Sequence, residues 1–298
     1  MPARITITEE STIVQNQLFL NNFKAKPFVK WVGGKTQLIP ELTKRIPEIR
    51  GRYYEPFLGG GALFFHIQSE LNSSQGCISD INSDLIAAYK AVKNSLQELI
   101  DSLQEHRYEK DYFYEIRELD RKPEYSTLTE VKKASRLIFL NKTCFNGLYR
   151  VNKKGQFNVP FGSYKNPSIF SEENLLACSQ ALQKTEIHNV SFETIASTAQ
   201  PGDFVYFDPP YIPLNASSNF TEYNQNGFDL KSQQMLRDVC LALDERGVNF
   251  LLSNSSSPLV YELYENHFEI ELVDASRAIN SKGNKRGKVK EVLIKNYG

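Results

Sequence analysis

The chain has 298 residues, of which 41% are apolar, enough to bury a sizeable core in one large α/β domain or in two domains. Thirty-five basic and 35 acidic residues cancel, so a nucleic-acid or membrane partner would have to be met by a local patch. No run approaches ~18 apolar residues, which excludes a membrane-spanning helix and, with no secretion signal at the N-terminus, favours a cytoplasmic protein.

The N-terminal half is predicted to alternate strands and helices. Residues 1 to about 24 lack a sustained period and are expected to form a loosely ordered extension. The run at 77–80 is apolar up to a final acid, which is typical of a strand buried on both faces. Apolar residues at three- and four-residue steps predict a helix over 83–103 with Ser83 as its N-cap, and a second amphipathic helix over 131–141.

The C-terminal half carries further strand signals. Residues 204–208 and 248–254 resemble the run at 77–80, so the three together predict parallel strands covered by helices. Glycines among alternating aromatic and polar residues predict a β-hairpin over 144–164, with "NKKG" at its tip. Residues 268–274 and 289–297 predict a terminal antiparallel hairpin.

The four cysteines indicate neither a disulfide framework nor a metal site. Cys77, Cys144, Cys178 and Cys240 lie far apart, form no C-x-x-C pair and do not cluster with the four histidines. We therefore expect reduced thiols and no metal ion.

"VKWVGGKTQL" at 29–38 imitates the end of a phosphate-binding loop. The full pattern needs a glycine where Val29 stands, so an ATPase is disfavoured. Two interpretations stay open: a glycine turn before a helix, or a loop laid against a ligand with Trp31 and Lys35 as contacts.

"YYEPFLGGGALFF" at 53–65 combines a strand, three glycines and a helix-forming run. Asp80 follows about 20 residues later, where doubly wound folds place an acid that accepts from ribose hydroxyls. Phe64 stands where a dinucleotide fingerprint requires a third glycine. The pattern favours an adenosine-type ligand over NAD; a tight turn with a helix-capping aspartate is the alternative.

"VYFDPPYIPL" at 205–214 ends an apolar strand with an acid, two prolines and a tyrosine. The prolines fix φ and remove two N–H donors, so the chain leaves the sheet on a rigid path with free carbonyl acceptors. Asp208, a carbonyl and the face of Tyr211 suit a flat ring that bears an amino group. A nucleobase is such a ring.

The segment 141–167 has the composition of a DNA-reading hairpin. Arg150 suits guanine, asparagine suits adenine, and Leu148 and Pro160 suit a thymine methyl group. By composition alone, an exposed hairpin with solvated charges is the better explanation.

In combination, six motifs closely resemble the Dam-type DNA adenine-N6 methyltransferases. They are "FVKWVGGK", "EPFLGGGALF", "SDINSDLI", "FNGLYRVNKKGQFNVPFGSY", "FDPPYIPL" and "NFTEY", and they span roughly residues 27–297 in the order of the α-class of amino-methyltransferases. The resemblance implies S-adenosylmethionine as methyl donor and a flipped adenine in duplex DNA, within GATC, as substrate. It also implies an α/β, Rossmann-like methyltransferase fold with a mixed sheet and helices on both faces.

The resemblance further implies a division into domains. Residues 25–83 and 169–298 would form the catalytic domain, and 84–168 an inserted helical target-recognition domain that carries the β-hairpin. Because the target-reading insert is in the same chain, we expect a monomer with no obligate protein partner.

Functional residues carry over position by position. The cofactor positions are matched by Trp31, Lys35, Phe57, Gly59, Gly61, Asp80 and Asp208. The catalytic motif is matched by Asp208, Pro209, Pro210 and Tyr211. The DNA-contacting positions are matched by Lys30, Phe145, Asn146, Leu148, Arg150, Asn152, Asn158, Pro160 and Tyr164. Phe145 replaces a tyrosine common in the family, and Ser163 stands where relatives often carry a basic residue.

Several expectations concern the surroundings of the site. The polar stretch 217–227 is expected to close over the flipped base. Phosphate contacts are expected from Lys132, Lys133, Arg136, Lys153, Lys154, Lys282, Lys285, Arg286, Lys288 and Lys290, although solvated charges explain the last five equally well. The rivals are amino-methylation of another DNA sequence, of cytosine N4, of RNA or of a protein amide, and a catalytically silent DNA-binding module.

Overall fold

The computed structural model describes residues 24–71, 75–214, 228–276 and 288–298. Within them the chain divides into two compact units. The first comprises residues 24–33 and Ala87–Gln183, and the second comprises Gly34–Ile86 and Lys184–Gly298. The predicted extension and the predicted closing stretch 217–227 lie outside the described residues. The assignment of catalysis and DNA recognition to separate domains stays a prediction.

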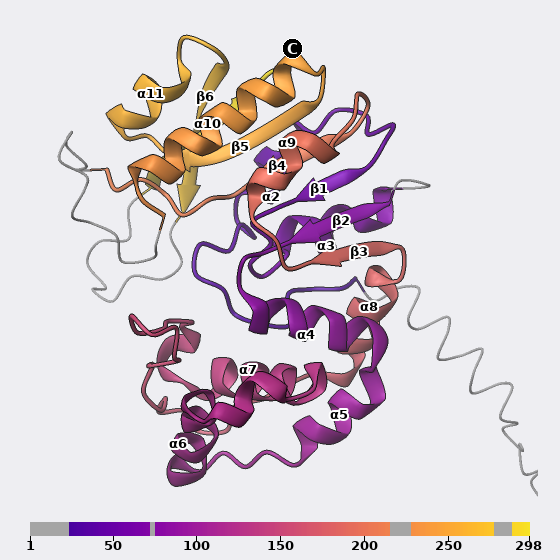
Figure 1. The fold of residues 1–298 in the computed structure, drawn as a ribbon, viewed down its shortest axis with the longest axis vertical. Coiled ribbons are helices and arrows are strands. Elements are labelled where there is room, and N and C mark those ends of the chain that lie inside the picture. The colour runs from indigo at the N-terminus through magenta and orange to yellow at the C-terminus, as the bar shows by residue number, and fades with distance from the viewer. Residues whose placement is uncertain (1–23, 72–74, 215–227, 277–287) are drawn as a thin grey trace, which may run out of the picture. The chain divides into compact units, whose positions relative to one another are not determined.

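A seven-stranded mixed sheet forms the second unit (Figure 1). Its strands are β1 (Tyr53–Glu55), β2 (Gly76–Ser79), β3 (Thr185–His188), β4 (Phe204–Phe207), β5 (Asn249–Ser255), β6 (Glu269–Ser276) and β7 (Lys288–Lys295). Their order is β3-β2-β1-β4-β5-β7-β6; the first five run parallel to one another, and β7 is antiparallel to both β5 and β6. The predicted α/β fold, parallel strands and terminal hairpin are confirmed.

The strand order reverses at β1, which pairs with β2 on one side and with β4 on the other. Open α/β sheets bind ligands beyond the carboxyl ends of their strands at such a switch point. The residues that follow β1, β2 and β4 are therefore the ones to inspect for a site.

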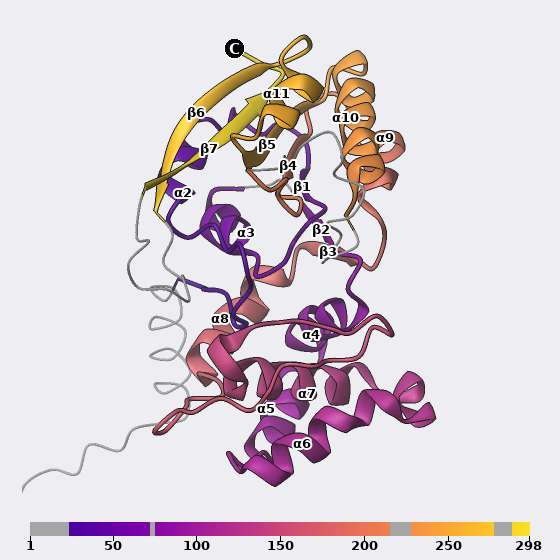
Figure 2. The ribbon, with the colours of Figure 1, turned by 90° about the vertical axis from the view of Figure 1, so that its left-hand side faces the viewer.

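Helices cover both faces of this sheet. They are α2 (Ile39–Thr43), α3 (Ala62–Ile67), α9 (Ile195–Thr198), α10 (Leu230–Glu245) and α11 (Pro258–Tyr264), with a 3₁₀ turn at Gln68–Glu70 and another at Phe192–Thr194. Figure 2 shows α2 and α3 on one side and α9 and α10 on the other. Helix α10 buries Leu236, Cys240 and Leu243, one stripe at helical spacing, in a core shared with Val205 and Phe250 of the sheet.

The first unit is largely helical. Its helices are α4 (Ser83–Asn94, which begins in the second unit), α5 (Leu96–Gln104), α6 (Lys110–Glu118), α7 (Glu130–Thr143) and α8 (Glu172–Leu182), with 3₁₀ turns at Leu119–Arg121, Pro123–Thr127 and Phe145–Gly147. The helix predicted over 131–141 is confirmed as α7.

Two details of the helix predicted over 83–103 were wrong. It is two helices, because Ser95 leaves helical geometry at φ −140° and ψ 44°. Ser83 is the first residue of α4, and Asn82 caps the helix instead: its Oδ1 accepts from the Leu85 N–H at 3.0 Å.

The hairpin predicted over 144–164 is only partly formed. Its tip is a turn in which the N–H of Asn152 donates to the Gln156 carbonyl at 2.8 Å, but the arms make two isolated antiparallel bridges instead of a ladder. Asn146 and Gly147 have φ of 57° and 64°, and Pro160 has no N–H to donate, so continuous strand pairing is interrupted.

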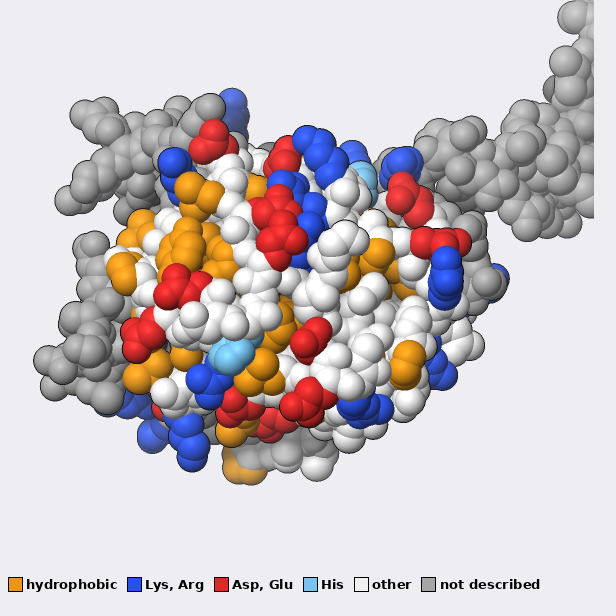
Figure 3. Space-filling view, turned by 90° about the horizontal axis from the view of Figure 1, so that it is seen from above, with side chains coloured by type: hydrophobic (Ala, Val, Ile, Leu, Met, Phe, Trp, Pro, Cys, Tyr) orange, Lys and Arg blue, Asp and Glu red, His pale blue; other side chains and the backbone are white. Residues whose placement is uncertain are grey.

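Charge is mixed over the surface drawn in Figure 3, where acidic and basic side chains are interspersed. None of the helices within the described ranges is long and apolar enough to span a bilayer.

Candidate active site

Three acids lie at the carboxyl ends of adjacent strands in the second unit. Glu55 is the last residue of β1, Asp80 follows β2, and Asp208 follows β4. Because β1 is parallel to both β2 and β4, these carboxyl groups occupy one edge of the sheet. This is the edge at which the strand order reverses.

The glycine loop after β1 holds Asp80. The N–H of Gly59 donates to Asp80 Oδ2 at 3.1 Å, and that of Asn82 donates to Oδ1 at 2.9 Å. Gly59 and Gly61 have backbone φ angles of 49° and 66°, which residues other than glycine rarely adopt. Burial raises the pKa of the Asp80 carboxyl, whereas the two N–H donors oppose the shift. An oriented carboxylate beside a close-approach loop fits the ribose of an adenosine-type ligand.

Asp208 is paired with Lys35. Lys35 Nζ lies 2.7 Å from Asp208 Oδ1, with the two side chains 9% and 19% exposed, and 4.5 Å from the ring centre of Tyr211. Burial raises the pKa of the Asp208 carboxyl; the Lys35 ammonium lowers it and the negative charge of Glu291 raises it. The structure therefore brings Lys35, predicted as a cofactor contact, to the catalytic motif.

The DPPY segment, residues 208–211 and the catalytic motif of the sequence analysis, is held by three residues that the sequence did not reveal. The hydroxyl of Tyr211 donates to Glu291 Oε2 at 2.8 Å. Gln233 Nε2 donates to the Pro210 carbonyl at 2.9 Å, and Asn254 Oδ1 accepts from the backbone N–H of Ile212 at 3.2 Å. Asn254 had a visible signal, because it ends the apolar run 248–254 at the same sheet edge as the acids. No sequence pattern pointed to Glu291 or Gln233.

Glu55 is a second carboxyl group that the sequence analysis did not select. It is 3% exposed and accepts from the hydroxyl of Tyr53 at 2.6 Å. Burial raises the pKa of Glu55 to about 8, with a contribution from the charge of Asp208, while the bond from Tyr53 lowers it. Glu55 is therefore mainly uncharged at neutral pH.

The first unit brings several predicted DNA contacts to its surface. Phe145 is 51% exposed at the 3₁₀ turn after α7, beside Asn146 with its positive φ. Arg150 is exposed, and its Nε donates to Asn158 Oδ1 at 2.7 Å. Pro160 is also exposed, whereas Leu148 is half-buried against the local core. The turn and Arg150 are therefore accessible at the surface of this unit, and their contact with DNA stays a prediction.

Other predicted DNA contacts are engaged within the protein. Asn152 Oδ1 accepts from the N–H groups of Lys154 and Gln156 at 2.9 and 3.1 Å, so this side chain shapes the tip of the hairpin. Tyr164 donates its hydroxyl to the Cys144 carbonyl at 2.9 Å, and Lys30 Nζ lies 5.3 Å from the centre of its ring.

Comparison with known proteins identifies the family. The model of the D12 class of N6 adenine-specific DNA methyltransferases matches residues 31–279. The chain belongs to this family.

Curated relatives agree over nearly the full length. The type II methyltransferase M1.LlaDCHI of Lactococcus lactis subsp. cremoris is 45% identical over 95% of this chain and 99% of its own. The type II methyltransferase M.MjaIII of Methanocaldococcus jannaschii is 43% identical over 92% of this chain and 100% of its own. The DNA adenine methylase of Escherichia coli K12 is 34% identical, covering 91% and 95%. The predicted enzyme class, an adenine-specific DNA methyltransferase, is confirmed.

Two predicted cofactor contacts of this D12 methyltransferase are aromatic. Phe57 is half-buried and stacks on Phe192 with ring centres 5.1 Å apart. Trp31 belongs to the first unit, where it stacks on Tyr149 at 4.8 Å. Their roles toward the cofactor stay predictions.

One predicted phosphate contact of the D12 methyltransferase was wrong. Arg136 is 3% exposed; its Nη2 lies 2.8 Å from Asp120 Oδ2, and it donates to the carbonyls of Ile116 and Arg117. A guanidinium this buried stabilises the helices around α7 and cannot belong to a basic face. Lys282, Lys285 and Arg286 lie outside the described residues.

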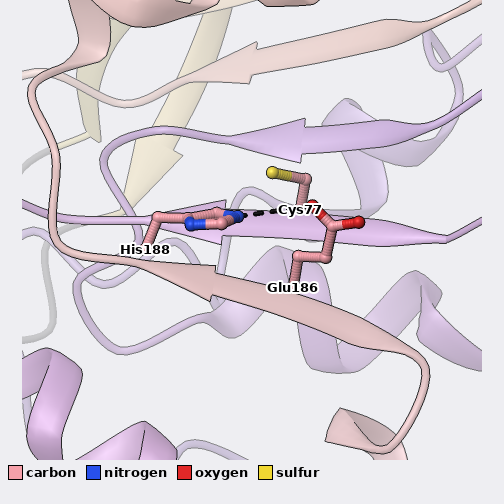
Figure 4. Close-up of side chains that lie close together, drawn as sticks. All are labelled: Cys77, Glu186 and His188. Atoms are coloured by element: carbon pink, nitrogen blue, oxygen red, sulfur yellow. Dashed lines mark hydrogen bonds and ion pairs between the residues drawn. The ribbon is translucent and has the colours of Figure 1, made fainter.

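Three potential metal ligands lie together on β2 and β3 of the D12 methyltransferase. Figure 4 shows Cys77, Glu186 and His188, with His188 Nε2 at 3.3 Å from Glu186 Oε2. Arg52 Nη1 lies 3.2 Å from the other oxygen of Glu186 and already neutralises its charge. Burial raises the pKa of the Cys77 thiol to about 11, so it is protonated at neutral pH. We therefore assign Glu186 to its ion pair with Arg52, and propose no metal at this group.

Proposed function

We propose that this chain transfers a methyl group from S-adenosylmethionine to N6 of an adenine flipped out of duplex DNA, within the sequence GATC. The observation that carries the proposal is the anchored DPPY segment: Asp208 at the sheet edge, with Tyr211 fixed by Glu291. Membership of the D12 family supports the reaction. The sequence GATC rests on the resemblance of the recognition residues and on the likeness to DNA adenine methylases.

The cofactor would be held by the glycine loop and Asp80. Gly59 and Gly61 permit close approach of the backbone, and the oriented carboxylate of Asp80 accepts from ribose hydroxyls. When bound, S-adenosylmethionine supplies an electrophilic methyl group.

Asp208 and the Pro209 carbonyl would activate the amino group of the target. The N6 lone pair of adenine is delocalised into the ring, so the amine is a poor nucleophile. Two acceptors for its hydrogens favour a more pyramidal nitrogen and stabilise the positive charge that develops on it. Lys35 holds Oδ1 of Asp208, and we assign the second oxygen, Oδ2, to the amino group. The proton leaves N6 after transfer, because an ordinary carboxylate is too weak a base to remove it beforehand.

Tyr211 would replace the stacking that the flipped base loses. Extrusion costs a few kcal/mol, and a rigid aromatic face in the pocket offsets part of it. The bond from Tyr211 to Glu291 fixes the ring, and the bond from Gln233 fixes the adjacent Pro210 carbonyl.

The first unit would supply recognition of the duplex. Phe145 and Asn146 are exposed at a turn suited to entering the space that the flipped base leaves. The guanidinium of Arg150 can donate two hydrogen bonds to the edge of a guanine. Because that guanidinium is bound to Asn158, both side chains form one recognition element.

The test is methyl transfer from labelled S-adenosylmethionine to a GATC duplex and to duplexes altered at each base pair. We expect transfer to GATC and losses of about 10-fold or more at altered pairs, since one base contact is worth about 1–3 kcal/mol. Asp208→Ala should reduce the rate by about 100-fold or more, as removal of a transition-state partner does. Asp238→Ala, at a side chain 62% exposed, is the matched control and should retain activity. Equal rates on all duplexes would contradict GATC recognition, and transfer only to RNA would favour that rival.

A further inference from the structure

The side chain of Asn141 connects two segments of the first unit that are far apart in sequence. Asn141 lies in the last turn of α7 and is 0% exposed. Its Oδ1 accepts from the backbone N–H of Lys30 at 2.7 Å, and its Nδ2 donates to the Lys30 carbonyl at 2.8 Å. Nδ2 also donates to the Gly147 carbonyl at 3.1 Å. One buried amide thus fixes both polar backbone groups of Lys30 and one group of the turn 145–147.

The stem of Lys30 packs directly against the same turn. A Cβ at Gly147 would lie 2.3 Å from Lys30 Cδ and 3.2 Å from its Cβ, so only glycine leaves room for this lysine. Beyond the stem, Lys30 Nζ lies 5.3 Å from the ring centre of Tyr164, whose hydroxyl is bound to the Cys144 carbonyl at the start of the turn. The lysine is held along its length while its side chain remains exposed.

Both segments belong to the proposed DNA-reading surface. Lysine donates to the acceptors of guanine, and Phe145 and Asn146 occupy the exposed turn assigned to the space left by base flipping. A contact to a base edge requires tight positioning, so a lysine with a loose backbone would bind phosphates as readily as guanine.

We infer that Asn141 is a positioning residue for target selection, which holds Lys30 and the turn 145–147 in a fixed relation so that Lys30 distinguishes guanine. This inference rests on the proposed function, because it assigns a determinant of specificity to that activity. Asn141 acts through Lys30, so its effect on discrimination should vanish when Lys30 is absent.

A double-mutant cycle tests this coupling. The measured quantity is the ratio of kcat/KM on a GATC duplex to kcat/KM on a duplex whose guanine pair is replaced by A·T. Asn141→Asp keeps the shape and the acceptor, but it places an oxygen against two carbonyls. We expect this change to lower the ratio by about 10-fold, because a buried group is left without its partner. Lys30→Ala should lower the ratio similarly, and the double variant should equal Lys30→Ala.

Gly147→Ala is the second variant and decides the matter if Asn141→Asp does not fold. It displaces the Lys30 stem while leaving Asn141 intact, so the ratio should fall as it does for Asn141→Asp. In the Lys30→Ala background the close contact with Cδ is gone. The strain of an alanine at φ 64° is the same in both backgrounds and is read from thermal melting, so the ratio should change no further. Thermal melting monitors the fold of each variant.

Three outcomes are decisive. Losses that multiply in the double variants would show a general structural role and overturn the inference. An unchanged ratio in Asn141→Asp and Gly147→Ala, with a wild-type enzyme that prefers GATC, would overturn the inference alone. A wild-type enzyme that methylates none of the duplexes would overturn the proposed function and the inference with it.

Discussion

Replacing Lys35 by methionine leaves Asp208 buried without its counter-charge. Unit charges 2.7 Å apart attract by about 6 kcal/mol at an effective dielectric constant of about 20. Desolvation offsets part of this attraction, and removing one partner of a buried pair costs about 3–5 kcal/mol in measured cases. Because Asp208 keeps 19% exposure, water screens the pair and we expect the lower end, about 3 kcal/mol.

The consequence for activity depends on pH. Burial already raises the pKa of Asp208 and Lys35 lowers it, so loss of Lys35 raises that pKa further. A protonated Asp208 is a poorer acceptor for the adenine amino group. At pH 7 the rate should fall by at most roughly 100-fold, the limit that about 3 kcal/mol sets, and part of the loss should be recovered as the pH rises.

The assay is the initial rate of methyl transfer across a pH series at saturating DNA and cofactor. Saturation separates this effect from any weakened cofactor binding by Lys35→Met. Lys44→Met, at a lysine 65% exposed whose carboxylate partner lies on the surface, is the matched control and should follow the wild-type profile. A Lys35→Met rate that is unchanged at pH 7, or equally low at every pH, would refute the role assigned to this pair.

Three further predictions concern stability. Glu55 has a pKa of about 8 against an ordinary value of 4.5, so its contribution is fully present below about pH 4.5 and is lost as the pH rises toward 8. In Glu55→Gln, the unfolding free energy should therefore decline less steeply with pH over this range, by up to about 1.4 kcal/mol per pH unit. Urea titrations at several pH values measure this decline, and the same decline in the variant and the wild type would show that Glu55 is not neutral in the fold. Asn82→Ala should lower the free energy of unfolding by about 1 kcal/mol in the same titrations, and Ser83→Ala should leave it nearly unchanged. The reverse result would show that Ser83 is the N-cap. Arg136→Met should lower the free energy of unfolding by about 3–5 kcal/mol, whereas Lys133→Met should lower it by less than about 1 kcal/mol. Equally small losses in both variants would contradict the buried ion pair of Arg136.

Residues whose neighbours are close in sequence were predictable. The strand at 204–207 and Asp208 after it follow from a local apolar run and from the prolines that end it. The glycine loop and Asp80 follow from the strand, turn and helix pattern of doubly wound folds. The rules that produced these expectations require only a short window of sequence.

Residues that act through distant partners were not predictable. Tyr211 is fixed by Glu291, 80 positions away, and Asn141 binds Lys30 across 111 positions. Their pairing depends on which strands and helices pack together, which periodicity does not encode. Lys35 shows the same limit, because its motif suggested a ligand contact, whereas its partner in the fold is Asp208.

Local rules also fail where two residues compete for one role. Asn82 and Ser83 are both good N-caps, and the helix selects the residue one position before its first turn. Arg136 was expected to contact phosphates, but a carboxylate and two carbonyls buried beside α7 bind it inside the unit. A basic residue in a pattern is therefore weak evidence for a basic surface.

The most direct test of the central claim is the identity of the methylated nucleoside. A GATC-containing duplex is incubated with the protein and S-adenosylmethionine, digested to nucleosides and analysed by mass spectrometry. The account predicts N6-methyladenine, at the adenine of GATC, and its loss in Asp208→Ala. N4-methylcytosine as the product, or no methylated nucleoside from the wild-type protein, would contradict it.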